Sequence, residues 1–250
     1  MRTVSIASAR PGHSAPRRAG VPAEPGTVAT LPVLRGYFDV LISAYGPQKW
    51  WPGRTRFEIV VGAILTQNTS WKNVEGAILS LRRNRKLQAA AVADTPLDEL
   101  AQLIRSSGYF RQKARKLKEF VAFLAKRYGG SLGKMVAAPT GKLRAQLLEV
   151  HGIGPETADS ILLYAGDHPV FVVDAYTRRI LQRHELLHGK ETYEEIQALV
   201  EKSLPRDTSV FNEFHALIVH VGKNFCRPKA PRCSACPLER FLPHPLEGAR

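Results

Sequence analysis

Three cysteines lie close together near the end of the 250-residue chain, at Cys226, Cys233 and Cys236. Because the sequence contains no other cysteine, a distributed disulfide framework is excluded. Thiols grouped within so short a stretch are typical of a local metal site in a reducing compartment. We therefore expect a metal-binding loop in the segment that follows residue 225.

A second segment, at about residues 143–165, combines two glycines with a proline. Gly152 and Gly154 predict a tight turn between two helices, and Pro155 stands where the first residue of the second helix belongs. Glycines let the backbone approach a phosphate closely, and the N–H groups at the start of a helix attract an anion. The segment therefore predicts a helix-hairpin-helix, although any pair of helices could use the same turn.

An acidic residue, Asp174, comes directly after the apolar run Val170–Val173. An aspartate in this position can cap the helix that follows it, because its side chain accepts hydrogen bonds from backbone N–H groups. Such a cap also fixes the direction of the carboxylate. The cap and a role in chemistry are therefore compatible.

Helices must position these segments, because apolar residues recur at spacings of three and four over most of the chain. Proline and glycine interrupt the pattern, and no segment alternates in the manner of paired strands. We predict an all-α protein of about ten helices, arranged in two lobes with a cleft between them. The clearest predicted helices cover Leu34–Tyr45, Phe57–Leu65, Val74–Leu81, Leu97–Ile104 and Leu117–Leu124.

The charge balance indicates the kind of partner. The chain has 36 Lys and Arg residues against 22 Asp and Glu residues, which gives a net charge of +14 at pH 7. Such a surface attracts polyanions, nucleic acid first among them, although a basic surface can also bind nothing. A membrane protein is excluded, since no apolar run approaches the roughly 18 to 20 residues of a spanning helix.

We expect three regions along the chain. Residues 1–30 are rich in Ala, Pro, Gly, Ser and Arg and lack apolar periodicity, so we expect a disordered extension, either a DNA-contacting tail or a plain one. Residues 31–225 form the helical core, and residues 226–250 form the cysteine loop and tail. Because the extension carries no convincing export or transit signal, we expect a cytoplasmic location, at the nucleoid if the source is bacterial.

The hairpin sequence His-Gly-Ile-Gly-Pro-Glu-Thr-Ala and the downstream Val-Asp resemble the endonuclease III superfamily of DNA glycosylases in order and separation. The resemblance extends from about Leu31 to Cys236. It implies a two-lobed helix-hairpin-helix glycosylase fold with a C-terminal metal-cluster loop, and it implies that Asp174 is catalytic. We expect a monomer that acts on damaged double-stranded DNA. The expected DNA contacts are Gln67, Gly152, Gly154 and Lys223.

Within the superfamily, the sequence looks most like the 3-methyladenine DNA glycosylase branch. The similarity rests on Trp50-Trp51-Pro52, on the run Phe57–Thr69 and on Gly-x-Glu-Thr-Ala-Asp at the hairpin. In that branch a flipped purine stacks between aromatic residues and meets a glutamate, and the matching positions here are Trp50, Trp71 and Glu156. Trp71 matches an aromatic position rather than an identical residue. Gln67 matches the residue that fills the gap left by the flipped base.

The implied pocket suits a purine alkylated on a ring nitrogen. Such a base is cationic, so indole faces attract it and a carboxylate complements its charge. Each aromatic stack can return about 1 to 3 kcal/mol toward the cost of extruding the base. Because the cationic base leaves readily, Asp174 needs only to stabilise an oxocarbenium-like sugar and orient water. Structural alternatives are tryptophans in the core or between lobes, Glu156 at a helix dipole and Gln67 as a helix-end amide.

Glu156 also bears on strand cleavage. In the bifunctional members of the superfamily a lysine occupies this position and forms a Schiff base. A carboxylate cannot form that imine, so we expect a monofunctional glycosylase without AP lyase activity. Two other classes stay open: an endonuclease III-like enzyme acting on oxidised pyrimidines or mismatches, and a noncatalytic helix-hairpin-helix DNA-binding protein.

The cysteine spacing resembles the first three ligands of the superfamily's four-cysteine iron–sulfur loop, and the fourth position falls on Leu242. Three thiolates can hold a three-iron cluster, or a 4Fe-4S cluster whose last iron takes another ligand, and His244 lies two residues further on. A Cys3His zinc site and an empty loop are the alternatives. We expect an iron–sulfur cluster whose role is to brace a basic loop against phosphates.

Overall fold

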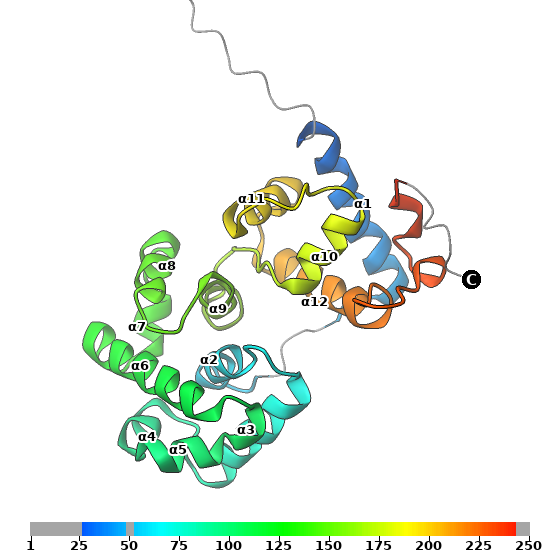
Figure 1. The fold of residues 1–250 in the computed structure, drawn as a ribbon. Helices are drawn as coiled ribbons and strands as arrows, with labels where there is room; N and C mark the ends of the chain where they lie inside the picture. Colours follow the sequence, from blue (N-terminus) through cyan, green and yellow to red (C-terminus); the bar gives the residue numbers. More distant parts are fainter. Residues whose placement is uncertain (1–26, 49–52, 244–250) are drawn as a thin grey trace, which may run out of the picture.

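The computed structural model describes residues 27–48 and 53–243, and within these ranges the chain forms helices and loops but no strand (Figure 1). The all-α prediction is therefore confirmed. The α-helices are α1 (Thr27–Tyr45), α2 (Arg56–Leu65), α3 (Trp71–Arg83), α4 (Ala89–Asp94), α5 (Leu97–Leu103), α6 (Phe110–Tyr128), α7 (Leu132–Val136), α8 (Thr140–Leu148), α9 (Pro155–Ser160), α10 (Ala175–Arg183), α11 (Tyr193–Ser203) and α12 (Thr208–Asn224). Short 3₁₀ turns are η1 (Arg105–Ser107), η3 (Cys233–Ala235) and η4 (Glu239–Phe241), and η2 (Ile161–Ala165) is a π-helical turn.

The five clearest predicted helices correspond to α1, α2, α3, α5 and α6. The short helices α4 and α7 were not predicted, because neither is long enough to establish an apolar period. Helix α1 begins at Thr27, inside the stretch expected to be irregular. No helix in the described ranges is both long and apolar enough to cross a membrane.

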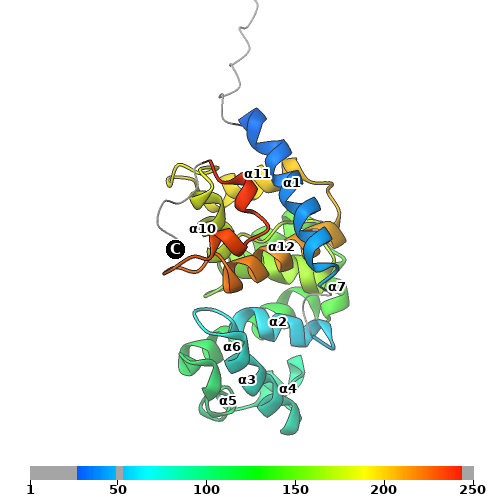
Figure 2. The same cartoon turned by 90° about the vertical axis from the view of Figure 1, so that its right-hand side faces the viewer.

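The helices are arranged in two lobes (Figures 1 and 2). In one lobe, α6 packs against α2, α4, α5 and α7. In the other, α1 packs against α11 and α12, and α10 packs against α12. The continuous unit of α9 and η2 connects the lobes, since it contacts α2 and α8 on one side and α12 on the other.

Helix α2 is central to the first lobe because nearly all of its side chains are apolar and buried. Its last turn is capped by Lys113 of α6, whose Nζ donates to the carbonyl oxygens of Leu65 at 2.8 Å and Ser107 at 2.7 Å. Burial, helped by the charge of Lys116, lowers the pKa of Lys113 to about 8. A buried amine is tolerated here because it meets the carbonyl end of a helix. This contact fixes the point at which the chain leaves α2.

The hairpin between α8 and α9 is fastened by a buried ion pair. Arg144 of α8 donates from Nε and Nη2 to the two carboxylate oxygens of Asp159 in α9, at 2.7 and 3.0 Å, and Asp159 is fully buried. Gln197 of α11 donates to the same carboxylate at 2.8 Å. The hairpin is therefore held against the second lobe as well as the first, which fixes the residues at its tip.

Candidate active site

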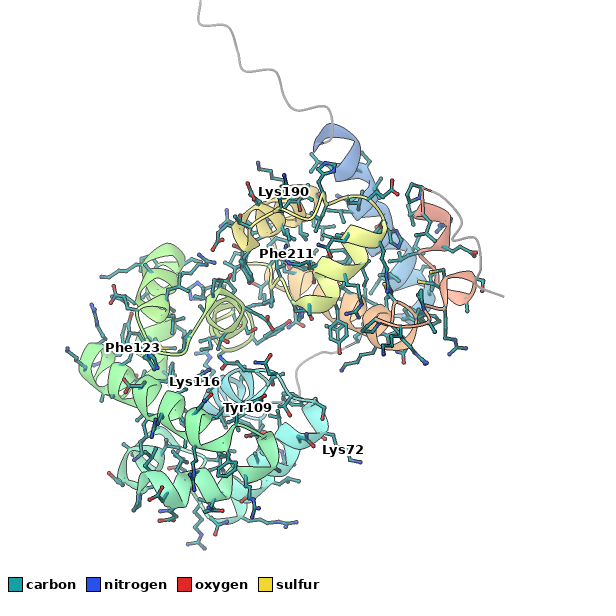
Figure 3. All side chains as sticks on the ribbon, viewed as in Figure 1. Lys72, Tyr109, Lys116, Phe123, Lys190 and Phe211 are labelled. Carbon is teal, nitrogen blue, oxygen red and sulfur yellow. The ribbon has the colours of Figure 1, made fainter. Side chains whose placement is uncertain are left out.

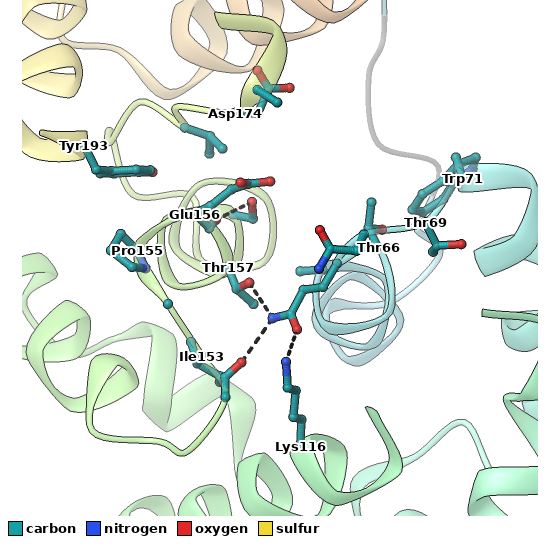
Figure 4. Close-up of a pocket in the computed structure, with 18 of the residues that line it drawn as sticks. Thr66, Thr69, Trp71, Lys116, Ile153, Pro155, Glu156, Thr157, Asp174 and Tyr193 are labelled. Carbon is teal, nitrogen blue, oxygen red and sulfur yellow. Dashed lines mark hydrogen bonds between the residues drawn. The ribbon is translucent and has the colours of Figure 1, made fainter. Parts of the chain in front are cut away.

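A cavity of about 1350 Å³ opens between the lobes (Figure 4). Its walls come from the end of α2 and the start of α3, from the hairpin, from the start of α10 and from α12. The lining residues include 66–72, 148–157, 172, 174–176, Lys116, Tyr193, His215 and Lys223. The cavity therefore brings together the two segments that the sequence singled out, the hairpin and Asp174, which lie about twenty residues apart in the chain.

Asp174 is the N-cap of α10, as its position before the helix predicted. Its Oδ1 accepts hydrogen bonds from the backbone N and the hydroxyl of Thr177, at 2.7 and 2.9 Å. Its Oδ2 lies 3.4 Å from Nε2 of His215, and the carboxylate is 11% exposed. Burial by itself would raise the pKa of Asp174, but His215 and Thr177 outweigh it and hold that pKa below its ordinary value. The carboxylate is therefore kept ionised inside the cavity wall.

Glu156, the second residue of α9, also lines the cavity, and Figure 4 shows it on the same wall as Asp174. Glu156 is exposed, and its side chain opens onto the cavity. Partial desolvation by the cavity walls, and next the negative charge of Asp174, raise the pKa of Glu156, while His215 opposes the rise. The two carboxylates therefore share one electrostatic environment.

Of the two tryptophans predicted for the pocket, the structure describes only one. Trp71 is the first residue of α3, is half-buried and lines the cavity, and its Nε1 donates to Glu75 at 2.9 Å. Trp50 lies outside the described residues. Two further aromatic residues line the cavity, Tyr176 and Tyr193, and the sequence analysis did not select them. Tyr176 could have been found from its place two residues after Asp174, whereas Tyr193 carries no such signal.

Gln67 lies just past α2 and bonds to the hairpin. Its Nε2 donates to the carbonyl oxygen of Gly152 at 3.1 Å and to the hydroxyl of Thr157 at 2.9 Å (Figure 4). Lys116 of α6, labelled in Figure 3, donates to its Oε1. Here the amide joins α2, α6 and the hairpin across the cavity floor. Its predicted role in filling the space left by a flipped base stays a prediction.

The two hairpin positions, 152 and 154, place different structural demands on their residues. Gly152 has φ +85°, a left-handed conformation, and a Cβ there would lie 2.5 Å from Cγ of Lys116. Gly154 is the extended N-cap of α9, and a Cβ there would meet no atom within 4 Å. Gly152 is therefore required by backbone conformation and space, whereas Gly154 leaves the tip of the hairpin open.

Lysines supply positive charge around the cavity. Lys72 of α3, Lys116 of α6 and Lys223 of α12 all line it, and Lys223 is exposed. Their placement agrees with the predicted DNA-binding role of Lys223, because phosphates approaching the cavity would meet cations from both lobes. That role itself stays a prediction.

His215 is a further polar residue of the cavity that the sequence analysis missed. It lies on α12, between Phe214 and Ala216 in a run of buried residues, and is 5% exposed. A histidine in such a run usually packs in the core, so its position in the sequence is only a weak signal of function. The fold turns it toward Asp174.

The three cysteines line one small cavity of about 20 Å³ together with Leu242. The residue at the fourth ligand position therefore offers an apolar side chain with no donor atom for a metal. Arg183 Nη1 donates to Cys226 Sγ at 3.3 Å. Burial raises the pKa of Cys236 to about 11 and also raises that of Cys233, so metal binding there must displace protons.

Within the described ranges, no three His, Cys, Asp or Glu side chains are grouped as metal ligands. The residues fit a three-thiolate site in donor type, and they do not fit a four-thiolate one. His244 lies outside the described residues. The metal-cluster loop therefore stays a prediction.

Comparisons with known proteins agree with this geometry. The chain is 47% identical over 208 residues to the candidate DNA repair glycosylase MJ1434 of Methanocaldococcus jannaschii, which covers 82% of this chain and 93% of that protein. The crystal structure of H. pylori 3-methyladenine DNA glycosylase bound to 1,N6-ethenoadenine is 27% identical, with a TM-score of 0.67 over 78% of this chain and 97% of that one. A trapped endonuclease III–DNA covalent intermediate shares the fold, at 23% identity, with a TM-score of 0.73 over 84% and 94% of the chains.

Residues 61–206 match the family model of the HhH-GPD superfamily of base excision DNA repair proteins. The matched segment is more than half of the chain and contains both the hairpin and Asp174. The chain therefore belongs to the HhH-GPD superfamily of base excision DNA repair proteins.

Proposed function

We propose that the protein is a monofunctional DNA glycosylase that hydrolyses the N-glycosidic bond of alkylated purines in damaged double-stranded DNA. The observation that carries the proposal is the cavity lined by both Asp174 and Glu156, the latter at the hairpin position where a Schiff-base mechanism requires lysine. Family membership supports base-excision repair, and the 27% identity to a 3-methyladenine DNA glycosylase supports the purine branch.

DNA binding in this proposal uses the charge around the cavity. Lys72, Lys116 and Lys223 and the backbone N–H groups of the hairpin bind phosphates on either side of the damaged nucleotide. The damaged base is extruded from the duplex into the cavity, where Trp71 offers an indole face. Trp50, which lies outside the described residues, stays the predicted second stacking residue. A protein of this kind acts as a monomer on one lesion at a time.

In this proposal the protein contributes mainly negative charge to the hydrolysis of the glycosidic bond. A purine alkylated on a ring nitrogen is already positive, so its glycosidic bond breaks with the electron pair leaving on the base. The sugar gains oxocarbenium character, which the Oδ2 oxygen of Asp174 stabilises, and water then adds to C1′ and loses a proton to the solvent. Glu156 complements the positive base before it leaves.

A second candidate, a glycosylase with AP lyase activity, is favoured by one observation. Although residue 156 is a glutamate, three lysines, Lys72, Lys116 and Lys223, line the same cavity. An amine among these that reaches C1′ unprotonated can attack the sugar aldehyde.

Incubation with damaged duplexes separates these candidates. Methylated DNA, and duplexes containing uracil, thymine glycol or a mismatch, are each treated with the protein, and released bases are identified. We expect release of 3-methyladenine and abasic sites that stay intact until alkali is added. Strand breaks before alkali, or a stoichiometric complex trapped by borohydride, would contradict the monofunctional proposal, and substitution of each cavity lysine would then identify the nucleophile.

We also propose that Cys226, Cys233 and Cys236 hold an iron–sulfur cluster whose function is to brace the loop. Anaerobically purified protein is expected to be brown and to contain iron and sulfide, and Cys233→Ser should lower both together. Colourless protein with stoichiometric zinc would establish the Cys3His alternative, and protein without metal would establish an empty loop.

A further inference from the structure

The two carboxylate oxygens of Asp174 have different surroundings. Oδ1 is fully engaged in capping α10 through Thr177. Oδ2 faces His215 Nε2 at 3.4 Å, and the His215 side chain is 7% exposed. Although it is buried, this ring nitrogen makes no hydrogen bond within the described part of the chain. A polar atom is normally satisfied at this depth, so its placement beside the candidate catalytic carboxylate indicates a function.

The rest of the ring is held firmly. Nδ1 of His215 is hydrogen-bonded to the hydroxyl of Tyr164, and the ring packs edge-on against Phe171, with centroids 6.0 Å apart and planes at 78°. With the Tyr164 hydroxyl as donor to Nδ1, Nε2 carries the hydrogen and directs it toward Asp174. The chain Tyr164–His215–Asp174 therefore links the hairpin unit, α12 and the start of α10.

Tyr164 lies in η2, where the helix that begins as α9 widens into a π-helical turn. Such turns are rare and occur often at functional sites. Here the turn places the Tyr164 hydroxyl against a histidine 51 residues further along the chain.

We propose that His215 is a positioning residue for the glycosylase reaction, in which its imidazole keeps Oδ2 of Asp174 ionised and directed into the cavity while Tyr164 fixes the ring. The proposal rests on the catalytic role proposed for Asp174. Two other titratable groups interact electrostatically with this carboxylate, Glu156 from α9 and Tyr176 from α10, and neither supplies positive charge. Of the titratable groups around Asp174, His215 is therefore the one that offsets the effect of burial on the carboxylate.

The test is single-turnover release of 3-methyladenine from methylated duplex DNA, measured against pH for wild type, His215→Leu, His215→Gln and Tyr164→Phe. We expect His215→Leu to slow release about 10- to 100-fold, the effect of losing an N–H group that faces a charged carboxylate. Asp174 acts when ionised, above its pKa, and removing His215 raises that pKa. The acidic limb of the profile, where the release rate falls as the pH is lowered, should therefore move to higher pH. His215→Gln keeps an N–H near Oδ2 and should recover most of the rate, and Tyr164→Phe should shift the limb less.

His168→Gln provides a matched control. His168 is a half-buried histidine bonded to Thr140 at 2.9 Å and to the carbonyl oxygen of Val136 at 3.0 Å, away from the cavity. The His168→Gln variant should keep the wild-type dependence of the release rate on pH, even if its melting temperature falls.

A structural role for His215 would lower the rate equally at every pH, together with the melting temperature. The proposal is overturned if His215→Leu and His215→Gln both retain the wild-type acidic limb. If His215→Leu does not fold, the positions of the acidic limb in His215→Gln and Tyr164→Phe test the proposal instead. If the wild type itself releases no base, the proposed function has failed, which is a distinct result.

Discussion

The Asp174→Asn variant is expected to release damaged bases about 1000-fold more slowly than the wild type, or not at all. Asparagine is as good an N-cap as aspartate, so its amide oxygen can accept the Thr177 hydrogen bonds and preserve the start of α10. What it cannot supply is the negative charge that stabilises the sugar. The measurement is single-turnover base release, together with the affinity for lesion-containing duplex, which should change little.

Asp207→Asn is the matched control for this experiment. Asp207 caps α12 by accepting hydrogen bonds from the backbone N atoms of Ser209 at 2.8 Å and Val210 at 3.2 Å, and it does not line the cavity. The same chemical change at this cap should leave base release intact. Comparable release by the Asp174→Asn enzyme would place catalysis on another residue.

Glu156→Gln is expected to slow excision of cationic 3-methyladenine about 10- to 100-fold and to change excision of neutral ethenoadenine little. The glutamate charge acts only on a base that carries charge. Because desolvation and Asp174 raise the pKa of Glu156, this charge is present above the raised pKa and is lost as pH falls through it. As the pH is lowered, the preference of the wild type for cationic bases should therefore begin to decline at a higher pH than it would with a glutamate of ordinary pKa. The Glu156→Gln variant should not show that decline.

Glu99→Gln tests the alternative in which Glu156 only stabilises a helix. Glu99 also lies in the first turn of a helix, α5, and does not line the cavity. A helix-dipole role predicts a loss of about 0.3 to 1 kcal/mol of stability in either variant, with no distinction between substrates. Equal loss of activity on cationic and neutral lesions, with a matching fall in melting temperature, would remove Glu156 from the base pocket.

Several features follow from the sequence because they depend on neighbours along the chain. Helices α1, α2, α3, α5 and α6 were predictable from apolar spacing, and the hairpin from the stereochemistry of Gly152 and Pro155. Asp174 was predictable as a cap, since its partner Thr177 is three residues away. The glutamate at 156, which argues against a Schiff base, is likewise read directly from the sequence.

Other features were decided only by tertiary structure, because they join residues far apart in the chain. His215 meets Asp174 across 41 residues through the packing of α12 on α10, and Gln67 meets the hairpin across 85 residues. The sequence could place Leu242 after the cysteines, but only the fold shows that it lines their cavity. The sequence thus determined which groups are present and how each helix begins and ends. The fold decided that the pKa of Asp174 is lowered and that of Glu156 is raised, because burial and the charges of distant residues set a pKa.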